Sequence, residues 1–357
     1  MTSALLREEV ERELLRLHLR GRSDVAREFL ALDHGCGFPR LEGYLARCRE
    51  LLRKARELSE EEFALLLRYL VGRTLAFPLD RPSEALADLV PLCAELAASA
   101  RRGGVVHRLA ELELLRAFHK IDAPGYRDSI VAGLRGLWPK LRDDLGPQTE
   151  LLDVLWRTGY WCRDAEILRE ARRMAGEATK TLRFSASYWH ARELALQRRH
   201  DEAVALLLGL LEAQDEVEDA GEGWRHYLTV ELAANEAELG RPEEAGQRLD
   251  RVVAELGNGR DPMLLWELAR ARAGVARAER DDARELTSWL EALDVVEGLG
   301  TDRLAGEFAV AAAEAAARCG DRAALARARA VLDATLPTLR SAADLREQAA
   351  RVPGLYS

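Results

Sequence analysis

Residues 228–256, LTVELAANEAELGRPEEAGQRLDRVVAEL, decide the fold, because they describe two helices joined by a tight turn at Gly240-Arg241-Pro242. Apolar residues recur at helical spacing on both sides of that turn. Proline suits the first turn of the second helix, where its missing N–H has no partner to lose. Two short helices cannot bury both of their apolar faces alone, so they need similar hairpins stacked beside them. The stretch therefore predicts a helical repeat.

The same pattern recurs along most of the chain. Each expected second helix opens with a small residue, and these openings lie at Ala85, Ser129, Ala165, Ala203, Ala245, Ala283 and Ala324. Their mean spacing is about 40 residues, which is typical of stacked helical hairpins. We therefore predict an all-α protein, a right-handed α-solenoid of about seven hairpins over residues 59–357, closed by a helix near 338–350. Residues 1–58 do not keep this spacing, and we predict that they form an N-terminal helical cap or small bundle.

The hairpin at 228–256 resembles a tetratricopeptide repeat. Ala233 lies midway along the first helix, Gly240 ends it, and Glu243, Glu244 and Ala245 open the second. The repeats exceed the 34 residues of the standard unit, and they are similar to the longer repeats of bacterial transcription activators and peptide-sensing regulators. The resemblance implies a concave surface, formed by the first helices, that binds a protein or peptide segment.

Composition narrows the classes of partner. The net charge is −9 and the pI about 5.5, so no global positive field attracts nucleic acid or anionic lipid. Five scattered cysteines favour reduced thiols, and neither a signal peptide nor a membrane-length apolar run is visible. Arginine far outnumbers lysine, which favours a GC-rich bacterial genome. We expect a cytoplasmic protein.

The register set by the alanines places several side chains on the expected concave groove. The predicted partner-binding residues are Tyr188, Arg192, Tyr227, Glu231, Asn235 and Arg272. Rigid aromatics and arginines suit an extended peptide, a helix or an acidic segment. The alternative is that the aromatic side chains fill the core between adjacent helices, which is the commoner use of rings at helical spacing.

The acidic stretch 212–226 offers a second candidate. It is either a solvated linker between two helices or a loop, with Trp224 and Arg225, on which a basic partner docks.

Signals for catalysis and metal binding are weak. Arg102 and His107 have the arginine-to-histidine spacing of small helical ribonucleases, but such spacings arise by chance among so many arginines. In the irregular stretch DHGCGFPR, residues 33–40, His34 and Cys36 are possible metal ligands together with Cys48, yet no CxxC pair or fourth ligand accompanies them. We predict no catalytic residue, no metal and no cofactor.

The sequence thus favours a non-catalytic scaffold or adaptor that holds a partner segment and acts as a subunit or regulator of a larger bacterial assembly. A peptide-sensing or small-molecule-sensing regulator is the alternative, and a ribonuclease is the less favoured one.

Overall fold

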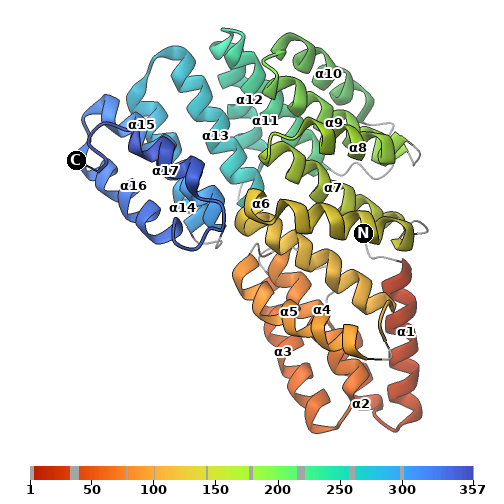
Figure 1. Cartoon of the computed structure of the whole chain (residues 1–357). Coiled ribbons are helices and arrows are strands. Elements are labelled where there is room, and N and C mark those ends of the chain that lie inside the picture. The colour runs from red at the N-terminus through yellow and green to blue at the C-terminus, as the bar shows by residue number, and fades with distance from the viewer. Residues whose placement is uncertain are drawn as a thin grey trace. The chain divides into compact units, whose positions relative to one another are not determined.

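The regular structure of the chain is α-helical (Figure 1). The computed structural model describes residues 4–32, 40–77, 79, 81–99, 101–141, 144–176, 180–214, 222–256, 262–297 and 301–356. Within those ranges the helices are α1 (Ala4–Leu19), α2 (Ser23–Leu30), α3 (Leu41–Glu57), α4 (Glu61–Ala76), α5 (Pro82–Ala98), α6 (Val105–Leu141), α7 (Leu145–Trp161), α8 (Ala165–Gly176), α9 (Lys180–Leu196), α10 (His200–Ala213), α11 (Glu222–Glu238), α12 (Pro242–Leu256), α13 (Pro262–Glu279), α14 (Asp282–Glu297), α15 (Asp302–Cys319), α16 (Arg322–Thr335) and α17 (Ala343–Ala350).

Consecutive helices pack as hairpins from α4 onward, which confirms the predicted all-α class. The pairs are α4 with α5, α9 with α10, α11 with α12, α13 with α14 and α15 with α16. The two parts of α6 approach closely at Leu115 and Gly133, and α7 approaches α8 at Gly159 and Leu168. Helix α6 divides at Asp122, whose extended backbone (φ −160°) interrupts the helix, and its carboxylate caps the second part by accepting the Gly125 N–H at 3.2 Å. The right-handed sense of the solenoid stays a prediction.

A left-handed residue closes the turn inside five successive hairpins. Positive φ values occur at Arg163, Arg198, Gly240, Arg280 and Gly320. At Gly240 the N–H donates to the Ala237 carbonyl at 3.0 Å and the Arg241 N–H donates to the Glu236 carbonyl at 3.0 Å. The other four turns repeat both bonds, so each first helix ends in the same motif. The α9–α10 turn therefore centres on Arg198.

Two compact units divide the chain. Unit 1 comprises residues 1–120 and 126–154, and unit 2 comprises residues 121–125 and 155–357. The predicted boundary at residue 58 falls inside unit 1, because the N-terminal helices pack directly on α4. The rings of Phe29 and Phe63 lie 5.3 Å apart, and Arg20 donates to the buried Glu60 carboxylate at 2.6 Å.

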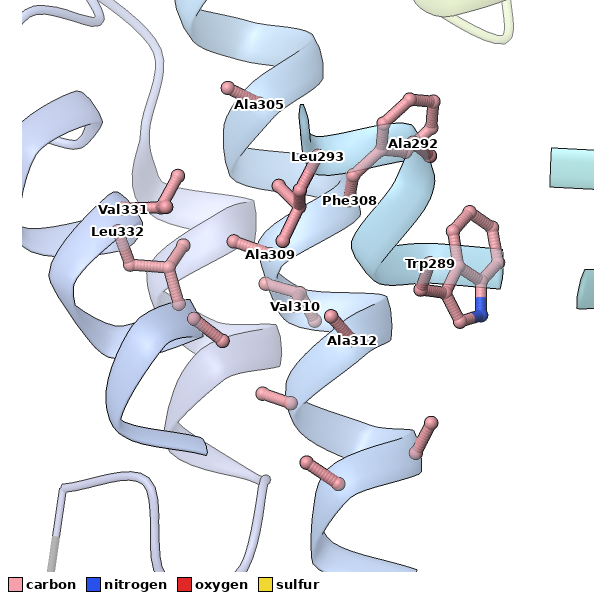
Figure 2. Close-up of a cluster of buried hydrophobic side chains, with 14 of the residues drawn as sticks. Trp289, Ala292, Leu293, Ala305, Phe308, Ala309, Val310, Ala312, Val331 and Leu332 are labelled. Carbon is pink, nitrogen blue, oxygen red and sulfur yellow. The ribbon is translucent and has the colours of Figure 1, made fainter. Parts of the chain in front are cut away.

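The core of unit 2 is built from small side chains with a few large ones among them. Figure 2 shows Trp289, Phe308 and Leu332 among the alanines of α14 and α15. Alanine lets neighbouring helices approach closely, and the large rings fill the remaining space. Val352 and Leu355 are buried in the same cluster, so the residues after α17 also pack against the core.

Candidate functional site

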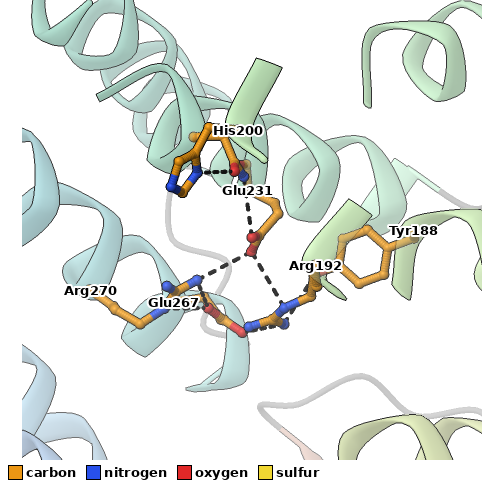
Figure 3. A network of polar contacts seen from close by, with 7 residues as sticks. Tyr188, Arg192, His200, Glu231, Glu267 and Arg270 are labelled. Carbon is orange, nitrogen blue, oxygen red and sulfur yellow. Dashed lines mark hydrogen bonds and ion pairs between the residues drawn. The ribbon is translucent and has the colours of Figure 1, made fainter. Parts of the chain in front are cut away.

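Four charged side chains on the first helices of unit 2 form a closed ring. Arg192 of α9 lies 2.8 Å from Glu267 of α13 and 3.5 Å from Glu231 of α11. Arg270 of α13 lies 3.2 Å from Glu231 and 2.7 Å from Glu267. Figure 3 shows the four side chains pointing toward one another. Each guanidinium therefore contacts both carboxylates, and the ring carries no net charge.

Polar neighbours extend the ring. The Arg192 guanidinium donates to the Tyr188 hydroxyl at 3.3 Å and lies over the Tyr160 ring at 4.4 Å from its centre. Asn235 donates to the Glu231 backbone carbonyl at 2.8 Å, which leaves its amide oxygen facing His200 Nδ1 at 2.9 Å. We assign the proton of His200 to Nδ1 on that basis. The network thus reaches from α13 to the start of α10.

The pKa values of the ring favour its charged form. Burial by itself raises the pKa of Glu267, but the guanidinium groups of Arg192 and Arg270 outweigh it and lower that pKa to about 2. Burial opposes the charge of Arg192 as well, and the neighbouring carboxylates nevertheless hold its pKa well above the usual value. Burial also raises the pKa of the Tyr188 phenol, so this hydroxyl stays neutral.

Aromatic side chains fill the space around the ring. Successive ring centres lie 5.3 to 6.4 Å apart along a continuous chain of contacts from Trp224 through Tyr188, Trp189, Tyr160, Trp161 and Trp266 to Phe308. The chain joins α11, α9, α7, α13 and α15. Tyr188, Trp189, Trp266 and Phe308 are buried, as the core-filling alternative expects, whereas Tyr160, Trp161 and Trp224 are half-buried.

The predicted groove residues differ from expectation in their exposure. Tyr188, Arg192, Glu231 and Asn235 do come together, but only 2% to 4% of each residue is exposed, because they bond to one another. Their role in holding a partner stays a prediction, and a partner would first have to open the network.

The remaining predicted residues lie apart from the ring. Tyr227 is half-buried against the core formed by α11, α12 and α13. Arg272 lies 3.9 Å from Asp250. Trp224 belongs to the aromatic chain, and Arg225 is exposed on α11. The middle of the acidic stretch, residues 215–221, lies outside the described residues.

Unit 1 contains a ring of the same composition that the sequence analysis missed. Arg73 lies 3.7 Å from Glu113 and 3.0 Å from Glu150, and Arg116 lies 2.9 Å from Glu113 and 3.3 Å from Glu150. Tyr69 precedes Arg73 by four residues, as Tyr188 precedes Arg192. Glu113 precedes Arg116 by three residues, just as Glu267 precedes Arg270. The repeated spacings, tyrosine four residues before arginine and glutamate three residues before arginine, are the sequence signal from which this ring could have been predicted.

An open cleft of about 570 Å³ lies beside the ring of unit 2. Arg163, Arg198 and Arg277 line it from the ends of first helices, with Glu193, Gln197, Glu238 and His200. Ala165, Leu168, Ala195 and Leu196 supply its apolar surface. Leu196 is 38% exposed, so the cleft presents an apolar side chain that a partner could cover. Because the ring and the aromatic chain fill the expected groove of unit 2, we take this cleft as the candidate binding site.

The other candidate residues have local structural partners or lie outside the description. His107 is buried, and its Nδ1 accepts the Gly103 N–H at 2.9 Å, whereas Arg102 is exposed. His34 and Cys36 fall outside the described residues, and Cys48 is buried. Among the described residues no group of histidine, cysteine and carboxylate side chains has the arrangement of a metal site.

Comparisons with known proteins bear on the fold of this chain and not on its activity or its partners. No protein-family model matches the sequence, and no curated protein does. Among solved structures, a putative kinesin light chain from Podosopora anserina, with nearly identical TPR-like repeats, matches at 16% identity and a TM-score of 0.24. The match covers 74% of this chain and 95% of that one. The chain has a tetratricopeptide-like helical-repeat fold. Its own paired helices and repeated turns define this fold. Within the described ranges, none of these helices combines the length and apolar character that crossing a bilayer requires.

Proposed function

We propose that the protein is a non-catalytic interaction scaffold that holds a segment of a partner protein in the cleft of unit 2. It would serve as an adaptor or regulatory subunit of a larger assembly, bacterial if the arginine-rich composition reflects its genome. The observation that supports this is an open cleft with an exposed apolar side chain, Leu196, beside a fully paired charged ring.

A preformed cleft favours binding for an entropic reason. The ring holds α9, α11 and α13 in register, and the left-handed turns at Arg163 and Arg198 fix the cleft edge. A partner segment then becomes ordered on binding while the scaffold does not, and this reduces the entropy cost of association.

The experiment is affinity capture from cells of the source organism, followed by mass spectrometry and by direct binding of the identified, purified partner. Leu196→Glu places a charge in the cleft. Leu208→Glu is the matched control, because Leu208 of α10 is 39% exposed and does not line the cleft.

We expect one partner that binds the wild type and Leu208→Glu equally and Leu196→Glu at least about tenfold more weakly, a loss of about 1.4 kcal/mol or more. Equal binding by both variants would place the partner elsewhere and overturn the assignment. Failure of the wild type to bind any protein would overturn the scaffold function.

A peptide-sensing regulator is the second candidate, favoured by one connection. His200 lines the cleft and contacts Asn235, which is bonded to Glu231 of the ring. A ligand that moves His200 would therefore change the hydrogen bonds and ion pairs that connect α10 with α11 and α13. Hydrogen exchange of the α11 amides, measured with and without the ligand, tests this candidate: unchanged protection excludes it.

A further inference from the structure

Two arginines of the cleft have no ion pair of their own. Arg277 is held by Glu285 at 2.6 Å, and Glu193 is held by Arg172 at 3.0 Å. Within the described ranges, Arg163 and Arg198 make no side-chain hydrogen bond or ion pair, and Arg163 has only a longer-range attraction to Glu307. Both residues are exposed, and both line the cleft.

The carboxylates of the cleft do not balance these charges. Glu193 is neutralised by Arg172, which leaves Glu238 as the exposed carboxylate of the lining. Two arginines without an ion pair, Arg163 and Arg198, therefore line the cleft with one exposed carboxylate, Glu238, in a protein whose net charge is −9. The cleft is locally positive where the chain as a whole is not.

The backbone supplies a second observation. Arg163 and Arg198 have φ values of 51° and 61°, in the left-handed region, whereas the equivalent turns at positions 240 and 320 use glycine. A side chain in that conformation costs about 1–2 kcal/mol relative to the right-handed one, a cost that glycine avoids. Two strained arginines thus stand at the edge of one cleft, where glycine would fit the turn better.

We propose that this cleft binds an acidic peptide segment in which carboxylates alternate with aliphatic side chains. The carboxylates pair with Arg163 and Arg198, since guanidinium groups form two parallel hydrogen bonds to a carboxylate. The aliphatic side chains cover Leu196, Ala195 and Ala165. This inference rests on the proposed scaffold function and specifies the chemistry of its partner.

The first test uses fluorescein-labelled hexapeptides and the full-length protein, with binding read by fluorescence polarisation. One peptide alternates glutamate and leucine, the second replaces glutamate with glutamine, and the third replaces leucine with serine. We expect the first peptide to bind at least about tenfold more tightly than either of the others, since two charged contacts and an apolar contact are each lost in turn. Its affinity should also fall with added salt.

The second test removes the two guanidinium groups by the Arg163→Gly, Arg198→Gly double variant. Glycine relieves the left-handed strain, so the variant should unfold at the same temperature as the wild type or higher, and lost binding cannot be ascribed to unfolding. Arg280→Gly is the matched control, because Arg280 occupies the equivalent turn (φ 60°) and does not line the cleft.

We expect the double variant to bind the glutamate–leucine peptide at least about tenfold more weakly, and Arg280→Gly to bind it as the wild type does. Unchanged binding by the double variant, or equal binding of the glutamine peptide, would overturn the inference. If no peptide binds but a cellular partner is still lost from Leu196→Glu, the scaffold function stands and only the acidic chemistry fails.

Discussion

Arg192 and Glu267 lie 75 residues apart in the sequence, yet Arg192 Nη1 lies 2.8 Å from Glu267 Oε1 and both side chains are buried. They come from α9 and α13, which flank α11, so the pair spans three first helices (Figure 3). Each helix places one or two charges on its inner side, and the charges neutralise one another only when the hairpins stack in register. The stacking of these three first helices therefore depends on the pairing of their buried charges.

Removing the Arg192 charge should destabilise unit 2. Arg192→Met keeps most of the apolar bulk but leaves the buried Glu231 and Glu267 with a single partner in the ring, Arg270. We expect a loss of about 3–5 kcal/mol, the usual result of breaking a buried ion pair, measured by urea unfolding followed by circular dichroism. Arg272→Met, whose nearest carboxylate is 3.9 Å away, should cost under about 1 kcal/mol. Equal losses in both variants would contradict the ring's structural role.

Acid should weaken the ring through Glu267. The folded pKa of about 2 lies below the ordinary value of 4.5, so the stabilisation is fully present above pH 4.5 and is lost as the pH falls toward 2. Glu267→Gln lacks this carboxylate at every pH. The difference in unfolding free energy between wild type and variant should therefore be largest near neutral pH and shrink as the pH falls through 4.5 to 3 and below. A difference that stays constant over that range would show that Glu267 is not held ionised.

Glu13 in unit 1 should respond in the opposite direction. Burial, together with a hydrogen bond to Glu62, raises the pKa of Glu13 from 4.5 to about 7. The protonated group favours the folded state, so its contribution is fully present below pH 4.5 and is lost as the pH rises through about 7. Glu13→Gln should remove this dependence and raise the melting temperature above pH 7. Glu11→Gln, at an exposed position of the same helix, serves as the control and should keep the wild-type pH profile.

Two glycines should give opposite effects when changed to alanine. A Cβ at Gly72 would lie 2.6 Å from Leu89 Cδ2, where α4 crosses α5, so Gly72→Ala should destabilise by about 1–3 kcal/mol. Gly136 of α6 has open space around it, and Gly136→Ala should stabilise by about 0.5–1 kcal/mol because alanine restricts the unfolded chain and favours helix. Thermal unfolding of both variants tests the pair. A stabilised Gly72→Ala would mean that α4 and α5 pack less closely than described.

The strain at Arg280 gives a stability prediction that does not depend on any ligand. Arg280 has a φ of 60° in the turn between α13 and α14. Arg280→Gly should stabilise by up to about 1 kcal/mol, since the relieved strain exceeds the added chain entropy of glycine. Gly240→Arg makes the reverse exchange at an equivalent turn and should destabilise by a similar amount. The two melting temperatures should therefore move in opposite directions.

The sequence by itself determined the elements and their pairing. Gly240, Pro242 and the alanines that open the second helices act through neighbouring residues, because turn conformation, helix starts and apolar periodicity are local properties. The all-α class and the hairpins could be predicted from them. The left-handed turns at Arg163, Arg198 and Arg280 could be located only approximately, since arginine gives no glycine-like signal.

Only the tertiary structure decided what the inner side chains do. Tyr188, Arg192, Glu231 and Asn235 lie together, but their low exposure depends on Glu267 and Arg270, which lie on a separate helix further along the chain. Whether a charged side chain faces solvent or a partner is set by contacts between residues tens of positions apart, which periodicity cannot encode. The stacking of successive hairpins buried these four residues and left the cleft at Arg163, Arg198 and Leu196 open.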